Sequence, residues 1–136
     1  MNDTLYMETT KKEPEQTSAE IESLLMKHGL VRFMKDYKDG ELELDHKEVP
    51  IKLPVRWRPL WLMAQNGETR YIRDEQQAKR VAWRQVLRWI EAQLALVDLE
   101  MVDIVEVFLP YMMINESQTL YERMCNNGMK LLEVDK

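Results

Sequence analysis

The sequence has few of the residues on which most catalytic and metal sites depend. It contains one cysteine, two histidines and four glycines. The single thiol, Cys125, leaves no intrachain disulfide, and we expect it to be free and packed. His28, His46 and Cys125 show none of the paired short spacings of zinc sites, and each glycine serves as a turn or a cap, so no phosphate loop is present. The sequence therefore predicts a protein without a metal, a cofactor or a nucleophile–base pair, which we interpret as non-enzymatic.

Long apolar runs are also missing. No stretch approaches the roughly 18 residues that a membrane span requires, and the N-terminal segment MNDTLYMETTKKEPEQ lacks the apolar centre of a signal peptide. We therefore expect a cytoplasmic protein with no membrane partner. At 136 residues, the chain has the length of one domain that can bury a substantial core.

The net charge of −5 argues against nonspecific nucleic-acid binding, but the charges are unevenly distributed. Residues 52–88 hold nine basic residues against three acidic ones, a local charge of +6, whereas both flanks are acidic. All four tryptophans lie in or beside this basic segment. The nine basic residues are Lys52, Arg56, Arg58, Arg70, Arg73, Lys79, Arg80, Arg84 and Arg88.

Residues 74–97 form the most clearly periodic segment and predict one long helix that begins at Asp74. On a helical wheel the apolar residues cover about 240°, so most of the helix should be buried. The remaining narrow sector carries Arg80, Arg84 and Arg88 at intervals of four. Like charges at this spacing destabilise an isolated helix, so either acidic residues elsewhere in the fold neutralise the row or it faces an anionic partner.

The elements before this helix predict a small antiparallel sheet. Residues 1–16 lack periodicity and predict a flexible tail, and Thr17 with Glu20 has the spacing of a capping box for a short helix that Gly29 ends. Asp39 and Gly40 between alternating segments predict a two-residue hairpin in which Lys38 pairs with Glu41. A third strand follows over residues 49–55, and its prolines at positions 50 and 54, which alternate with the apolar residues, indicate that it lies at a sheet edge or is short.

The remaining segments add shorter elements. We expect short helices over residues 60–65, from Asp103 to about Pro110, and from Thr119 to Gly128, a short buried strand over 111–114, and a strand or a frayed end over 129–136. The order of elements predicts an α+β fold. In this fold a three-stranded antiparallel meander, with a late strand as an optional addition, packs on a long central helix and shorter flanking helices. Residues 17–136 form its single domain.

The tryptophans support two interpretations. Trp83 and Trp89 lie within the apolar arc of the long helix and are expected in the core. Trp57 alternates with Arg56 and Arg58, a pattern that occurs in base-stacking surfaces, in protein-docking surfaces and in ordinary packing.

The block AWRQVLRWIEAQLALVDLEMVDIVEVFLPYMM, with TLYERM after it, resembles small uncharacterised proteins encoded by bacteriophages and integrated mobile elements. The likeness extends more weakly through IKLPV to IESLLMKHG and is a pattern of core residues without a catalytic motif. It implies an accessory factor in the host cytoplasm that binds nucleic acid or a host machine, including host-defence inhibitors.

Two functional hypotheses follow. The first is a factor that binds nucleic acid or a nucleoprotein machine through a basic surface, made by Arg56, Trp57, Arg58, Arg80, Arg84 and Arg88. It predicts that Arg56, Arg58, Arg80 and Arg84 form one exposed patch with Trp57 at its edge. The second is a protein-binding inhibitor or assembly factor that uses acidic or methionine-rich surfaces. Neither hypothesis requires a small-molecule substrate, and both are compatible with a homo-oligomer.

Overall fold

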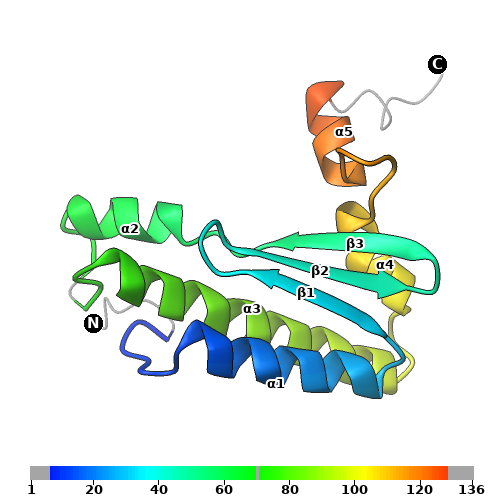
Figure 1. The fold of residues 1–136 in the computed structure, drawn as a ribbon, viewed down its shortest axis with the longest axis horizontal. Helices are drawn as coiled ribbons and strands as arrows, with labels where there is room; N and C mark the ends of the chain where they lie inside the picture. Colours follow the sequence, from blue (N-terminus) through cyan, green and yellow to red (C-terminus); the bar gives the residue numbers. More distant parts are fainter. Residues whose placement is uncertain (1–6, 70, 129–136) are drawn as a thin grey trace.

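The structure, a computed structural model, describes residues 7–69 and 71–128. Its elements run in the order α1 (Pro14–Lys27), β1 (Arg32–Asp36), β2 (Glu41–His46), β3 (Val49–Pro54), α2 (Arg58–Gln65), α3 (Glu75–Asp98), α4 (Ile104–Phe108), the 3₁₀ helix η1 (Leu109–Tyr111) and α5 (Leu120–Asn126). The three strands form one antiparallel sheet in the order β1-β2-β3 (Figure 1). The predicted α+β fold and its meander are confirmed.

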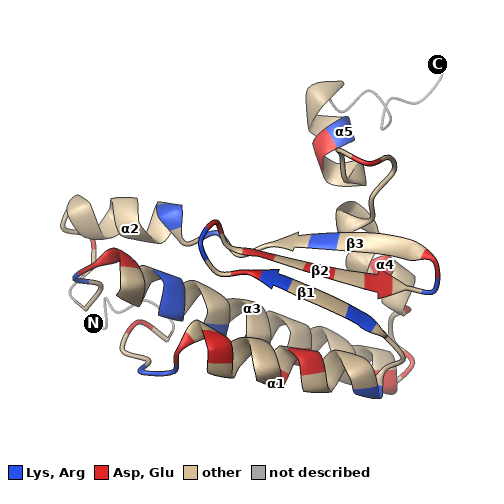
Figure 2. Cartoon of the chain, viewed as in Figure 1, with Lys and Arg blue, Asp and Glu red and all other residues tan. Residues whose placement is uncertain are grey.

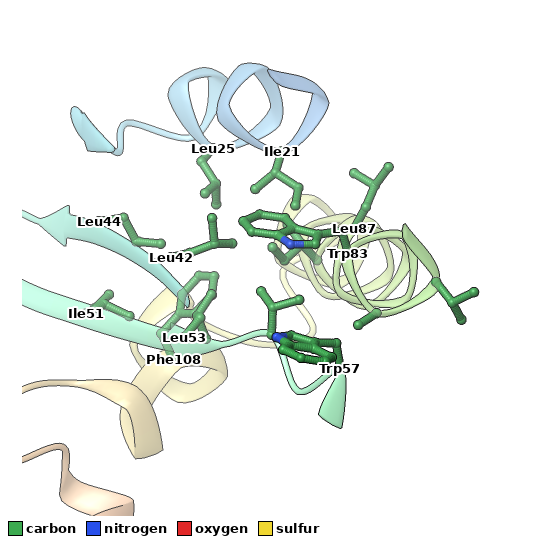
Figure 3. Packing of buried hydrophobic residues seen from close by; sticks show 14 of the residues in the cluster. Ile21, Leu25, Leu42, Leu44, Ile51, Leu53, Trp57, Trp83, Leu87 and Phe108 are labelled. Carbon is green, nitrogen blue, oxygen red and sulfur yellow. The ribbon is translucent and has the colours of Figure 1, made fainter. Parts of the chain in front are cut away.

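The core lies between the sheet and the helices. Alternation along the strands points Leu42 and Leu44 of β2 to one face, where they pair with Leu53 and Ile51 of β3. Trp83 of α3 lies at the centre of this layer, fully buried between α1 and the sheet (Figure 3). These contacts confirm that Trp83 is a core residue and that α3 is the central helix.

The long helix is positioned by its cap and by α1. Asp74 is the N-cap, and its carboxylate accepts a hydrogen bond from the Gln77 N–H at 2.8 Å. Side chains linking the two helices occur in the same order along both, from Glu13 with Arg80 to His28 with Asp98. The two helices therefore run side by side in the same direction (Figure 1).

The start of α1 differs from the prediction. The capping box forms between Glu13 and Gln16, not between Thr17 and Glu20, and Pro14 occupies the first turn. Ahead of it the chain contacts α3, because the Gln77 side-chain amide donates to the carbonyls of Glu8 and Thr10. Helical structure therefore begins before Thr17. Residues 1–6 of the predicted tail lie outside the described residues.

The hairpin also differs from the prediction. Asp36, not Lys38, pairs with Glu41, so the connection has four residues and not two. The Asp36 carboxylate accepts hydrogen bonds from the N–H groups of Lys38 and Asp39, which stabilises the longer turn. The predicted edge position of the third strand is confirmed, because β3 is the last strand of the sheet.

The C-terminal part has no strand where one was predicted over residues 111–114. Leu109–Tyr111 is a 3₁₀ helix, and beyond it Met112 and Met113 form isolated bridges with Ile51 and Thr119. The caps of α4 and α5 at Asp103 and Thr119 are confirmed. The prediction of a strand or a frayed end over residues 129–136 concerns residues outside those that the structure describes. Among the described helices, none is both long and apolar enough to cross a membrane.

Candidate functional site

The arginine row of α3 lies against acidic residues. The Arg80 Nε donates to the Glu13 carboxylate at 2.7 Å, and Arg88 pairs with Glu91 one turn along α3. The Arg84 side chain is 4% exposed, and its Nη1 contacts Glu20 and the Thr17 hydroxyl. Of the three acidic partners, Glu20 lies on α1, the helix that runs parallel to α3, and Glu13 is the N-cap residue of that helix.

The prediction that Arg56, Trp57, Arg58, Arg80 and Arg84 make one exposed basic patch is therefore wrong. The physical reason is that α1 covers α3 on the arginine side and supplies carboxylates at matching positions. The alternative interpretation, internal neutralisation of the row, describes the structure. On the sheet, acidic residues of β2 lie between β1 and β3, which both carry basic residues (Figure 2).

Trp57 is buried, with 6% of its surface exposed, and belongs to the same hydrophobic core cluster as Trp83 (Figure 3). Two cations lie on its ring, Arg58 at 4.6 Å and Lys79 at 4.7 Å from the centroid. Arg58 also forms an ion pair with Asp39 at 3.2 Å. Trp57 is thus enclosed by the protein's own side chains and is a packing residue.

Trp89 is more exposed than the sequence predicts. It was expected in the core, yet 37% of its surface is exposed. Its ring makes edge contacts with Phe108 and Tyr111, with centroids 6.0 Å and 6.2 Å apart. These contacts fix one side of the indole and leave the other side toward solvent.

Trp89 forms one wall of a surface hollow of about 270 Å³, which we call the Trp89 groove. It lies where the end of β3, the middle of α3 and η1 meet, and its walls are mostly apolar. The lining residues are Leu53, Pro54, Arg56, Ala82, Gln85, Val86, Trp89 and Tyr111.

A second hollow of about 290 Å³ adjoins the Trp89 groove and shares Pro54, Arg56 and Tyr111 with it. Its other walls come from the outer sheet face and from α5, and they include Glu41, Lys52, Thr119, Tyr121 and Glu122. We call it the Tyr121 hollow. Arg56 and Tyr111 therefore form the ridge between two adjoining hollows.

The charges around the Tyr121 hollow are mostly paired. The Lys52 ammonium lies 3.8 Å from the carboxylates of both Glu41 and Glu43. Burial raises the pKa of the Glu41 carboxyl, partly offset by the charge of Lys52. Arg56 differs: its side chain is exposed, and it forms no ion pair with any residue of the segments 7–69 and 71–128.

The thiol of Cys125 lies one helical turn after Tyr121. It is exposed, so the prediction of a packed thiol is wrong. The first turn of α5 makes most of the contacts between this helix and the rest of the molecule, chiefly with η1. The far end of α5 is therefore exposed to solvent (Figure 1). The hydrogen bond to Cys125 raises the pKa of the Tyr121 hydroxyl, against the charge of Arg56, which lowers it.

Of the predicted contact residues, Arg56 alone lines the Trp89 groove. The groove itself was not predicted. Its walls come from residues 53–56, 82–89 and 111, which no local pattern connects. Within the described segments, no group of three His, Cys, Asp or Glu residues is placed to hold a metal ion.

No protein-family model matches the chain, and comparisons with curated proteins and with solved structures find no match.

Proposed function

We propose that the protein is a non-enzymatic binding protein that takes a segment of a partner protein in the Trp89 groove. This is an accessory role of the kind that the resemblance to phage and mobile-element proteins implies. The observation that carries the proposal is the arrangement of Trp89, Tyr111 and Arg56 around one hollow. A few residues supply most of the binding energy at protein interfaces, and tryptophan, tyrosine and arginine are enriched among them.

The size and lining of the groove support a side-chain anchor. Sites for small molecules typically enclose roughly 300–1,000 Å³, and the groove, at about 270 Å³, lies just below this range. Its indole wall is already held by Phe108 and Tyr111, so a partner meets a rigid surface. A preformed site of this kind loses little conformational entropy on binding.

A second candidate is binding of nucleic acid or a nucleoprotein through Arg56 and Arg58, the predicted contacts that remain exposed. Arg58 favours this candidate only weakly, because Asp39 already pairs with it. Phosphate binding by these arginines would fall steeply with salt. A gel shift with single- and double-stranded DNA and RNA at low salt tests it, and the absence of any shift contradicts it.

The proposal is tested by affinity capture from bacterial lysate with three forms of the protein: wild type, Trp89→Ala and Leu62→Ala. Leu62 is the matched control, because it is an exposed apolar residue, 59% exposed, on α2 and away from the groove. Circular dichroism and thermal unfolding establish that each variant folds.

We expect one protein that wild type and Leu62→Ala recover in comparable yield and that Trp89→Ala loses. Equal recovery by all three forms contradicts the proposal, as does the failure of wild type to recover any protein above the background of an unrelated bait.

A further inference from the structure

We propose that the segment bound in the Trp89 groove carries an acidic side chain beside a bulky apolar one, and that Arg56 binds its carboxylate. This inference rests on the proposed function and specifies its partner. It follows from the difference between Arg56 and the other cations of this region, and from the composition of the groove walls.

Arg56 has capacity for an anionic partner that its neighbours lack. Lys52 is shared between Glu41 and Glu43, and Arg58 is paired with Asp39. Arg56 is exposed and has no ion pair within residues 7–69 and 71–128. A guanidinium presents donors in a planar fork that matches a carboxylate, and such bidentate pairs are stronger than neutral hydrogen bonds.

The charges near Arg56 favour a single carboxylate over a phosphate. Glu41 and Glu122 line the adjoining Tyr121 hollow, on the other side of Arg56. A phosphate group carries close to two negative charges at neutral pH, and a nucleic-acid backbone carries many, so both meet stronger repulsion from these carboxylates. A singly charged side chain placed on the groove side of Arg56 avoids most of it.

The groove beside Arg56 accepts an apolar side chain. Arg56 is the charged member of the lining set, and the walls next to it include Leu53, Val86 and Trp89. Burying a large aliphatic or aromatic side chain there stabilises the complex, because its apolar surface is removed from water. A carboxylate near its rim then fixes the orientation of the segment, because charge complementarity contributes specificity.

The test is selection of random dodecapeptides displayed on phage against the wild-type protein, Arg56→Glu and Arg73→Glu. Arg73 is the matched control, because it is exposed and lies before the start of α3, far along the helix from Trp89. We expect wild type and Arg73→Glu to enrich peptides with Asp or Glu within two positions of a large apolar residue. We expect Arg56→Glu to enrich Lys or Arg at the same position.

A synthetic peptide from the wild-type selection should bind Arg56→Glu at least about tenfold more weakly, and its Asp→Asn form should show a similar loss with wild type. Enrichment without acidic residues, or the same peptides with Arg56→Glu, overturns the inference. If such peptides still lose affinity with Trp89→Ala, the proposed function survives. Peptides insensitive to Trp89→Ala, or no enriched peptide at all, contradict both.

Discussion

Arg84 of α3 donates from Nη1 to the carboxylate of Glu20 on α1, and this pair joins the two longest helices at a buried position. The arginine is almost fully enclosed, whereas half of the Glu20 side chain is exposed. Arg84, which the sequence assigns to a candidate binding surface, therefore helps to hold α1 and α3 together.

Removal of Glu20 should therefore destabilise the fold. Glu20→Ala leaves the enclosed guanidinium without its counter-charge, and we expect a loss of about 1–3 kcal/mol in the free energy of unfolding. The loss is below that of a fully buried pair because water screens the exposed side of Glu20. Urea unfolding measures it.

Glu22→Ala is the matched control on the same helix. Glu22 pairs with Lys35 at 3.8 Å in an exposed position, so its loss should cost less than about 1 kcal/mol. Equal effects of Glu20→Ala and Glu22→Ala would show that the Arg84 pair contributes nothing beyond an ordinary surface pair.

His28 should make stability depend on pH. Its Nδ1 lies 2.9 Å from the Leu24 carbonyl and its Nε2 lies 2.8 Å from Asp98, and both partners accept. The hydrogen bond to Leu24 and the contact with Asp98 raise the pKa of His28 above 6.5, against desolvation and the charge of Lys27, which lower it. A protonated ring satisfies both contacts.

Because the folded pKa is raised, the stabilisation is fully present below pH 6.5 and is lost as the pH rises through the folded pKa. We expect the free energy of unfolding of wild type to fall more steeply than that of His28→Gln as the pH rises above about 6.5. Parallel profiles for wild type and His28→Gln would contradict the role of His28.

Gly40 is required by its position in the hairpin. Its φ is +86°, and a Cβ there would lie 2.2 Å from the Val55 carbonyl oxygen and 3.0 Å from Trp57 Cδ1. Gly67 has a similar φ of +77° with open space around it. Gly67→Ala should cost about 1–2 kcal/mol from backbone strain alone.

Gly40→Ala should cost about 1–3 kcal/mol more than Gly67→Ala, because the added methyl group must displace backbone as well. Thermal unfolding of the two variants measures the difference. Equal costs would mean that the β1–β2 turn and the Trp57 region yield without penalty.

Local sequence patterns predicted the positions of the helices better than the contacts between elements that are distant in the sequence. The periodicity of residues 74–97 and the caps at Asp103 and Thr119 predict α3, α4 and α5, because each depends on residues a few positions apart. The pairing of Arg84 with Glu20 could not be predicted, since the residues are 64 positions apart and depend on how α1 packs. The turn after β1 was also mispredicted, although it involves only neighbouring residues. The Asp36 carboxylate stabilises a four-residue connection, and this outweighs the preference of Asp39-Gly40 for a two-residue hairpin.

For the candidate site, too, the sequence predicted the helix but not the contacts made across the fold. Trp89 lies within the apolar arc of its helix, and the wheel therefore assigns it to the core. Its exposure arises because the Phe108–Tyr111 region covers only one side of the indole. A helical wheel gives the direction in which a side chain points and not the element that packs against it. It therefore cannot distinguish a core tryptophan from one at the rim of a groove.

A partner segment that binds in the Trp89 groove should change the environment of the Trp89 indole directly. The most direct measurement is a titration of the ¹⁵N-labelled protein with a display-selected peptide, in which the indole N–H signals of its four tryptophans are followed by NMR. Trp89→Phe assigns the signal of interest. We predict that the Trp89 signal shifts in a saturable manner while that of the core residue Trp83 stays in place. A saturable shift of the Trp57 signal with Trp89 unmoved would contradict it.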